Sequence, residues 1–181
     1  DEPLIEIGFR LRRAVTLADT IGGDMRLLIC GLNPSPYSAE VGVGFGRPGN
    51  RFWPAARASG LVSVAAHDPT AALTVDRVGM TDLVKRPTRR ADELSPNEYA
   101  TGLARVERLV AWLRPRAICF VGLAGWRAAV DRKAVAGPQD ATVGDRPVYL
   151  MPSTSGLNAH ATLDSLAEHL RAAADLADAA D

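Results

Sequence analysis

Lysine and cysteine are scarce in this chain, and it has no excess charge of either sign. Its 181 residues carry a formal net charge of zero, include two cysteines, and have two lysines among 21 basic residues. Overall neutrality excludes a strongly basic coat for nonspecific nucleic-acid binding but leaves room for a local patch. The arginine guanidinium forms bidentate hydrogen bonds with phosphate groups, so the arginine excess could serve phosphate binding. The base composition of a genome can also produce such an excess.

The few cysteines and the short apolar runs limit the class of protein further. Cys30 and Cys119 fall within predicted core strands, where a free thiol behaves as a small hydrophobe. The chain has no CxxC motif and no His/Cys cluster, and an iron–sulfur cluster needs more thiolates than are present. No apolar run approaches the ~20 residues that span a bilayer, and no signal-peptide pattern is seen. We therefore expect a soluble, reduced, cytoplasmic protein without metal or cofactor.

Strand-like and helix-like apolar patterns alternate along the chain. Strands are predicted at residues 27–30, 75–81, 117–121 and 148–151. Helices are predicted at residues 4–21, 52–58, 96–113, 122–130 and from 163 onward, with a loop and short helix at 65–72 and a polar excursion at 131–146. At roughly 150 residues per domain, the chain forms one domain, with its core at about residues 25–176. The alternation predicts a three-layer α/β/α fold around a parallel sheet of about four strands.

Local signals mark where several of these helices begin. Ser95, Pro96 and Glu98 combine an N-cap, proline at the first helical position and a glutamate three residues after the cap, which is a capping box. Asn50 and Thr162 are predicted N-caps of the helices that follow them.

Polar residues follow three of the predicted strands. Asn33 comes after the first strand, Asp82 after the second, and a small polar loop at residues 153–160 after the last. Ligands of parallel α/β sheets bind at the carboxyl edge, where these three loops converge. Two structural interpretations stay open: Asn33 with Pro34 can initiate a turn, and Asp82 can cap a turn or helix.

A glycine-rich loop lies behind Asn33. Gly42, Gly44 and Gly46 superficially resemble a phosphate cradle. No Lys-Ser/Thr pair follows them, and they do not sit directly between a strand and a helix as a dinucleotide fingerprint does. Binding of a nucleotide cofactor is therefore disfavoured.

Three stretches resemble one protein family. Residues 31–34 (Gly-Leu-Asn-Pro), Phe45 and residues 48–53 (Pro-x-Asn-Arg-Phe-Trp) resemble the first motif of the mismatch-specific uracil/thymine DNA glycosylases, within the uracil-DNA glycosylase superfamily. Residues 81–95 resemble the middle segment of that family, and residues 151–157 (Met-Pro-Ser-x-Ser-Gly-Leu) its second motif. The stretches occur in the family's order and spacing, from about residue 27 to the last helix.

The resemblance implies a monofunctional glycosylase that removes a wrong base, chiefly uracil opposite guanine, without cutting the DNA backbone. The expected partner is double-stranded DNA with a mismatched or deaminated base, and single-stranded DNA is a second candidate. The enzyme is expected to act as a monomer, without metal or cofactor and away from membranes, and on the nucleoid if the protein is bacterial. Such an enzyme must extrude the base and read it in a pocket.

Site residues follow from the same resemblance. Asn33 is expected to position the water that attacks the sugar C1′, and Phe45 to stack on the flipped base. Leu157 would be the wedge that fills the vacated base stack, as apolar intercalating side chains do elsewhere. The other expected base-binding residues are Leu32, Ser35, Tyr37 and Ser38. The other expected DNA-binding residues are Ser153, Ser155, Gly156, Asn158, His160 and Arg86.

Asp82 is a candidate second catalytic residue. An amide such as Asn33 is not a useful general base at neutral pH, so it orients water but transfers little proton. The family varies at the position of Asp82, and a carboxylate there could activate water or stabilise a developing oxocarbenium-like charge.

Some residues depart from the family pattern or have a second interpretation. Ser35 stands where the better-known members have glycine, and the arginine often found soon after the wedge leucine is missing. His160 is either its substitute or a solvated loop residue. Arg86, Arg89 and Arg90 either hold phosphates or form a solvated charge run.

Two further functions stay open at this point. One is a catalytically weak lesion- or mismatch-binding protein that keeps the flipping apparatus. The other is an unrelated α/β small-molecule hydrolase, which predicts no DNA affinity and no salt-dependent binding. Uracil, thymine, hypoxanthine, xanthine and etheno adducts all remain candidate bases.

Overall fold

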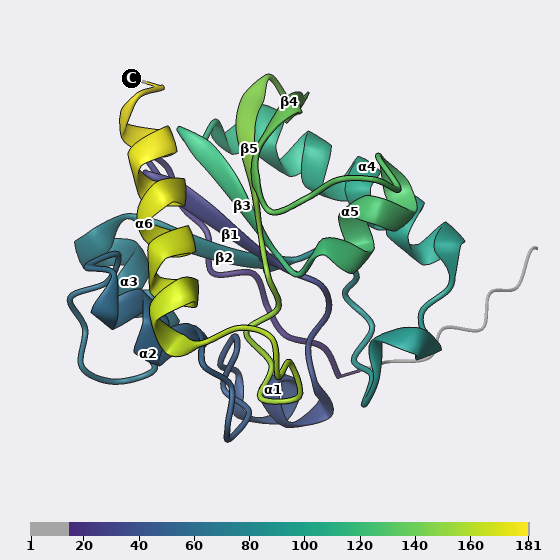
Figure 1. Cartoon of the computed structure of the whole chain (residues 1–181), viewed down its shortest axis with the longest axis horizontal. Helices are drawn as coiled ribbons and strands as arrows, with labels where there is room; N and C mark the ends of the chain where they lie inside the picture. The colour runs from purple at the N-terminus through teal and green to yellow at the C-terminus, as the bar shows by residue number, and fades with distance from the viewer. Residues whose placement is uncertain (1–14, 181) are drawn as a thin grey trace, which may run out of the picture.

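A central sheet lies between two layers of helices in the computed structural model, which describes residues 15–180 (Figure 1). Its strands are β1 (Leu27–Gly31), β2 (Val78–Asp82), β3 (Ala117–Val121), β4 (Gly137–Val143) and β5 (Arg146–Met151). Its helices are α1 (Pro36–Val41), α2 (Phe52–Ala58), α3 (Pro69–Asp76), α4 (Pro96–Leu113), α5 (Leu123–Ala129) and α6 (Leu163–Asp178), with a 3₁₀ turn, η1 (Ala91–Glu93).

The sheet has the strand order β2-β1-β3-β5-β4. β1 pairs in parallel with β2 and β3, β3 pairs in parallel with β5, and β4 runs antiparallel to β5. The predicted parallel sheet of about four strands is confirmed by β1, β2, β3 and β5. Residues 131–146 were predicted to contain no strand, which was wrong because β4 lies within them. Because β4 is an edge strand with mostly exposed or half-exposed side chains, it lacks the apolar pattern of a buried strand.

Two apolar clusters form the core, one on each face of the sheet. Leu27 and Ile29 of β1 pack in the cluster with α2, α3 and α6. Leu28 and Cys30 point to the opposite face and pack in the cluster with α4 and α5. Figure 1 shows α6, α2 and α3 on one side of the strands and α4 and α5 on the other. The predicted three-layer α/β/α fold is therefore confirmed.

The capping predictions hold in substance. Ser95 Oγ accepts from the Glu98 N–H, and Glu98 Oε2 accepts from the Ser95 N–H at 2.9 Å, so the capping box of α4 is present. Thr162 caps α6. The N-cap position of α2 is Arg51, one residue later than predicted, but Asn50 Oδ1 still accepts from the Phe52 N–H at 2.9 Å.

The helix predicted at residues 4–21 was wrong for the part of it that the structure describes. Residues 4–14 of the predicted helix lie outside the described residues. Residues 15–21, here called the N-terminal strap, are extended rather than helical. Thr20 and Met80 exchange two backbone hydrogen bonds of 2.9 and 2.7 Å as an antiparallel bridge. The free edge of β2 therefore outweighs the helical spacing of apolar residues in the strap.

Two local predictions near the site also need correction. Residues 36–41 form α1, where only a loop was predicted; Ser35 Oγ accepts from the Ser38 N–H at 3.1 Å and Gly42 ends the helix in a left-handed conformation. α3 extends through Asp76, so β2 begins at Val78 rather than at Val75. Gly42 is thus a helix C-cap, in agreement with the rejection of a phosphate cradle.

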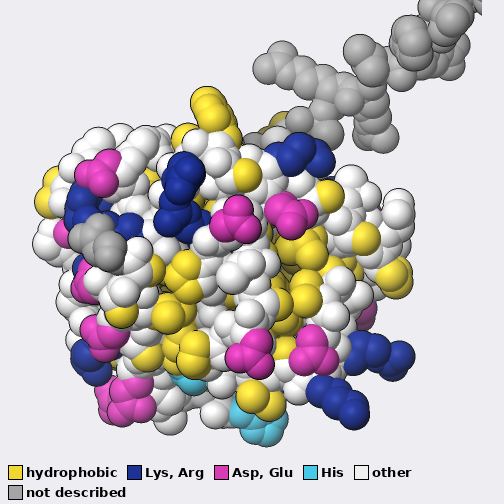
Figure 2. Space-filling view, turned by 90° about the horizontal axis from the view of Figure 1, so that it is seen from above, with side chains coloured by type: hydrophobic (Ala, Val, Ile, Leu, Met, Phe, Trp, Pro, Cys, Tyr) yellow, Lys and Arg dark blue, Asp and Glu magenta, His cyan; other side chains and the backbone are white. Residues whose placement is uncertain are grey.

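Acidic and basic side chains are mixed on the molecular surface (Figure 2). On the face seen from above in Figure 2, acidic and basic side chains are interspersed around apolar ones rather than separated by sign. Between residues 15 and 180, no helix combines the length and apolarity needed to cross a membrane.

Candidate active site

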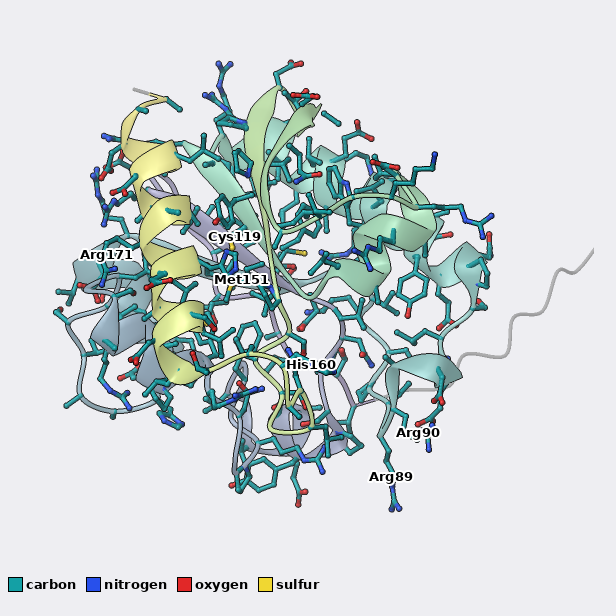
Figure 3. All side chains as sticks on the ribbon, viewed as in Figure 1. Arg89, Arg90, Cys119, Met151, His160 and Arg171 are labelled. Carbon is teal, nitrogen blue, oxygen red and sulfur yellow. The ribbon has the colours of Figure 1, made fainter. Side chains whose placement is uncertain are left out.

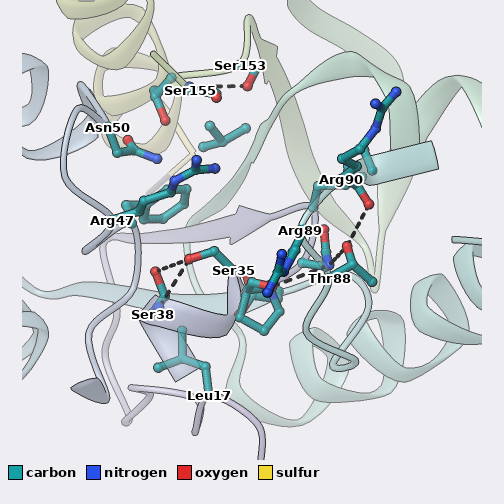
Figure 4. Close-up of a pocket in the computed structure, with 18 residues that line it drawn as sticks. Leu17, Ser35, Ser38, Arg47, Asn50, Thr88, Arg89, Arg90, Ser153 and Ser155 are labelled. Atoms are coloured by element: carbon teal, nitrogen blue, oxygen red, sulfur yellow. Dashed lines mark hydrogen bonds between the residues drawn. The ribbon is translucent and has the colours of Figure 1, made fainter. Parts of the chain in front are cut away.

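The carboxyl ends of three parallel strands meet at one cavity of about 180 Å³ (Figure 4). Asn33 reaches it from the loop after β1, Asp82 from the end of β2, and Ser153 from the loop after β5. The register pairs Gly31 with Asp82, so the first two loops leave the sheet side by side. The cavity is smaller than the roughly 300–1,000 Å³ sites of drug-sized ligands and suits a small ring.

Asn33 is held in one orientation by acceptors. Its Nδ2 donates to Thr88 Oγ1 at 2.7 Å and to the Arg86 main-chain oxygen at 3.0 Å. Thr88 Oγ1 donates its own proton to the Arg90 main-chain oxygen at 2.7 Å, so it accepts from Asn33. Because both partners accept, the amide nitrogen must face them. Asn33 Oδ1 is then available to hold a water.

The loop that orients Asn33 is itself anchored on α4. Arg86 donates to Glu98 through Nε at 2.6 Å and Nη2 at 3.0 Å, and also to the Glu93 main-chain oxygen at 2.7 Å. The hydrogen bond from Arg86 lowers the pKa of Glu98 to about 2, so this pair persists over the neutral range. Arg86 therefore fixes the position of the carbonyl that Asn33 contacts.

Asp82 is a buried carboxylate at the cavity wall. Its residue is 7% exposed. Burial raises the pKa of Asp82 to about 6, the like charge of Asp19 adds to that rise, and Lys85 and Arg105 oppose it. A carboxylate with a raised pKa in a cavity is the usual sign of a group that accepts a proton near neutral pH.

Glycine and an aromatic pair shape the space beside Asp82. A Cβ on Gly31 would lie 2.6 Å from Asp82 Oδ1 and 3.3 Å from the Phe45 ring, so only glycine leaves room for both. Phe45 stacks on Phe52 with ring centroids 4.2 Å apart and an interplanar angle of 20°. Phe45 also lines the cavity. One of its faces is therefore covered, and the ring can stack on a planar base.

Two serine hydroxyls line the same cavity from α1. Ser35 Oγ donates to Ser38 Oγ at 3.1 Å, and Figure 4 shows this pair facing the cavity. Ser38 is almost fully buried. Polar hydroxyls on the wall can read the edge of a bound base.

The loop after β5 is held by one arginine. Arg51 donates to the main-chain oxygens of Ala161, Ser155 (3.0 Å) and Asn158 (2.7 Å). Asn158 Nδ2 adds a hydrogen bond of 2.9 Å to the Ser153 main-chain oxygen. The Arg51 guanidinium and the Asn158 amide thus hold this loop, which we call the wedge loop, residues 153–161.

Leu157 projects from the wedge loop into solvent. Its residue is 82% exposed, an unusual position for a leucine on an otherwise fixed loop. Gly156, beside it, packs so closely that a Cβ would lie 2.7 Å from the Gly49 main-chain oxygen. A hollow lined by Arg47, Asn50 and Leu157 adjoins the cavity.

The family model of the Uracil DNA glycosylase superfamily matches residues 19–177. The chain belongs to the uracil-DNA glycosylase superfamily. Membership identifies a DNA glycosylase, a hydrolase that acts on uracil in DNA. The matched range covers the N-terminal strap from Asp19, all five strands and the wedge loop.

Most of the predicted glycosylase residues lie together. The cavity lining includes these predicted residues: Asn33, Asp82, Phe45, Leu32, Ser35, Ser38, Ser153 and Ser155. Gly156 and Leu157 line the adjoining hollow. Tyr37 is 44% exposed on α1 and is not part of the lining, and Arg86 faces α4. His160 is exposed at the wedge loop, in view at the centre of Figure 3.

Several residues of the site were not predicted. Thr88 and Arg51 stand inside the family-like stretches, but their hydrogen-bonding roles carry no sequence signal. Arg47 lines the cavity and was not singled out either. Arg89, one of the three arginines predicted to hold phosphates or to form a solvated charge run, lines the cavity from a different loop and extends away from the body of the protein in Figure 3. Among residues 15–180 no group of three His, Cys, Asp or Glu side chains is placed to hold a metal ion.

Proposed function

We propose that this protein is a monofunctional glycosylase that hydrolyses the N-glycosidic bond of a flipped-out uracil, chiefly uracil opposite guanine in duplex DNA. The observation that carries the proposal is that an oriented amide, Asn33, and a buried carboxylate, Asp82, share one cavity with the exposed face of Phe45. The preference for a mismatch rests on the likeness of residues 31–53, 81–95 and 151–157 to the mismatch-specific members.

In the proposed reaction, Asn33 positions the attacking water and Asp82 accepts its proton. Asn33 Oδ1 accepts a hydrogen bond from a water that attacks C1′ of the deoxyribose. As the new C–O bond forms, the C1′–N1 bond breaks and its electron pair leaves with the uracil as an anion. Asp82 receives the proton of the water, which is efficient because its pKa of about 6 lies just below neutral pH. The proton then returns to the uracil anion on release.

The same arrangement accounts for binding of the flipped base. Phe45 stacks on the base, while Ser35 and Ser38 face its edge. Leu157 fills the gap left in the duplex, and the exposed His160, three residues further along the wedge loop, contacts the orphaned guanine.

Base release from end-labelled duplexes tests the proposal directly. Duplexes with one uracil, thymine, hypoxanthine or xanthine opposite each base are incubated with the protein, and alkali then reveals abasic sites. We expect fastest release from G·U, and a fall of about 100-fold or more in Asn33→Ala and in Asp82→Asn. Asn97→Ala and Asp140→Asn, at exposed positions outside the cavity, are the matched controls.

Three outcomes count against the proposal. Tight binding of mismatched duplex without base release would replace the enzyme with a lesion-binding protein. Release that is equal from A·U and G·U would remove the mismatch preference. Full activity of Asp82→Asn would return Asp82 to a structural role.

A further inference from the structure

The Asp82 carboxylate has no hydrogen-bond donor within the described part of the chain. No hydrogen bond among residues 15–180 reaches its side-chain oxygens, and the nearest cation, Lys85 Nζ, stays 3.8 Å from Oδ2. Its oxygens are not among the fully buried atoms without a partner, because Asp82 lines the cavity and is open to water there. Lys85 Nζ is thus near enough for an ion pair with Asp82 but too far for a hydrogen bond.

Lys85 is held by a second carboxylate instead. Its ammonium donates to Asp19 Oδ1 at 2.7 Å, a full charge-assisted hydrogen bond. The lysine thus lies between two carboxylates but pairs closely with only one of them. Asp19 receives the hydrogen bond from Lys85, and Asp82 keeps only the longer ion pair of 3.8 Å.

Asp19 is fixed strongly enough to retain Lys85. Thr81 Oγ1 donates to Asp19 Oδ1 at 2.7 Å, and Arg105 Nη1 donates to Oδ2 at 3.0 Å. Burial by itself raises the pKa of Asp19, but the hydrogen bonds from Lys85 and Thr81 outweigh it and hold the pKa below its ordinary value. Asp19 therefore stays ionised wherever the enzyme is active.

The N-terminal strap brings Asp19 to this position. The strap is joined to β2 by the Thr20–Met80 bridge, and Thr16 Oγ1 donates to the main-chain oxygen of Lys85. Leu17 of the same strap lines the cavity, where Figure 4 shows it below the serine pair. The strap is thus a wall of the cavity and also the support of Asp19.

We propose that Asp19 is a positioning residue of the reaction: by holding Lys85 at hydrogen-bond distance from itself and at 3.8 Å from Asp82, it leaves the Asp82 carboxylate without a hydrogen-bonded cation and free to receive the proton of the attacking water. The inference rests on the proposed function, in which Asp82 is the proton acceptor. Without Asp19, the Lys85 ammonium would move onto Asp82 and make it a weaker base.

The groups that face Asp82 come from each neighbouring element. Lys85 follows on the loop after β2, Asp19 stands on the strap, and Arg105 on α4 donates to the Asp82 main-chain oxygen. Cys30 of β1 is neutral, because burial and the nearby Asp82 raise the pKa of its thiol. Of the charged groups, Asp19 raises the pKa of Asp82, and Lys85 and Arg105 lower it.

Two substitutions should shift the acidic limb of the rate–pH profile in opposite directions. In Asp19→Asn the acidic limb of the single-turnover rate on G·U duplex should shift to lower pH by about one unit, because Lys85 pairs with Asp82 and a like charge is lost. The rate well below the midpoint, as a fraction of the plateau, then rises about tenfold. In Lys85→Met the limb should shift to higher pH by a similar amount.

The double variant separates the action through Lys85 from the loss of the Asp19 charge. In the Lys85→Met background, Asp19→Asn should move the limb less than it does alone, since no ammonium is left to relocate. Asp24→Asn is the matched control, because Asp24 pairs with Arg77 at the surface and should leave the pH profile unchanged. Thermal unfolding confirms that each variant is folded.

Carbon-13 NMR titration of the aspartate carboxyl groups tests the inference without catalysis. The Asp82 signal is assigned by its loss in Asp82→Asn, and its midpoint should fall in Asp19→Asn and rise in Lys85→Met. Midpoints that do not move, or that move in the same direction, overturn the inference even if Asp82 is the base. Midpoints that move as expected while Asp82→Asn keeps full activity would overturn the proposed function instead.

Discussion

Asn33 Nδ2 lies 2.7 Å from Thr88 Oγ1, and this contact decides which way the amide of the active site points. Thr88 is almost fully buried, and its hydroxyl donates a hydrogen bond to the Arg90 main-chain oxygen. The Oδ1 that we propose binds the attacking water is therefore oriented by a residue that need not touch the substrate.

Thr88→Val tests this orientation, because valine keeps the shape of threonine and loses the acceptor. We expect the single-turnover rate to fall at least about tenfold while DNA affinity changes little, since the amide is left free to rotate. Thr101→Val, at an exposed position of α4, is the control. A rate equal to wild type would show that the Arg86 carbonyl alone orients Asn33.

Arg51→Lys should loosen the wedge loop. A lysine cannot reach the three carbonyls that Arg51 contacts, so we expect the free energy of unfolding to fall by about 2 kcal/mol. Base release from duplex should fall as well. Urea denaturation and single-turnover kinetics measure the two effects, with Arg132→Lys, an exposed position, as control. An unchanged unfolding curve would show that the hydrogen bonds from Arg51 do not stabilise the wedge loop.

Leu157→Ala should reduce activity without reducing stability. The residue is 82% exposed, so the free energy of unfolding should stay within about 0.5 kcal/mol of wild type. Release of uracil from duplex DNA should fall about tenfold or more, and release from a single strand should fall less, because no stack must be filled there. Val135→Ala, 67% exposed, is the control. Equal losses on both substrates would argue against a wedge.

Asp82→Asn should stabilise the protein at alkaline pH. The rise of the Asp82 pKa from 3.8 to about 6 means that the folded state binds the proton more tightly than the unfolded state. The ionised form then costs the fold up to about 3 kcal/mol above pH 6, and this cost disappears as the pH falls through 6 toward 4. The variant should therefore unfold at higher urea concentration than wild type at pH 8, and the difference should shrink at pH 4.

Gly31→Ala should damage the site through sterics alone. The added Cβ meets Asp82 Oδ1 at 2.6 Å and the Phe45 ring at 3.3 Å, so the carboxylate or the ring must move. We expect base release to fall at least about tenfold. Gly23→Ala, where a Cβ meets nothing within 4 Å, should have wild-type activity. Activity of Gly31→Ala at the wild-type level would show that neither group needs its present position.

Short-range patterns along the chain are sufficient to predict the layers of the fold and the positions of the main site residues. Buried strands such as Ala117–Val121 read as continuous apolar runs, and the capping box at Ser95 and Glu98 depends only on neighbours in the chain. Because strand and helix alternate, Asn33 and Asp82 had to meet at one edge of a parallel sheet.

The burial, charge environment and hydrogen-bond partners of those residues depend on contacts between distant parts of the chain. The strap at residues 15–21 follows a helical apolar pattern, yet it pairs with the free edge of β2 and brings Asp19 to Lys85. The pKa of Asp82 is raised mainly by burial in the folded chain, and the carbonyls that Arg51 holds lie more than a hundred residues away in the sequence. Local propensity contains no information about such partners, because burial and charge are set by what the folded chain brings together.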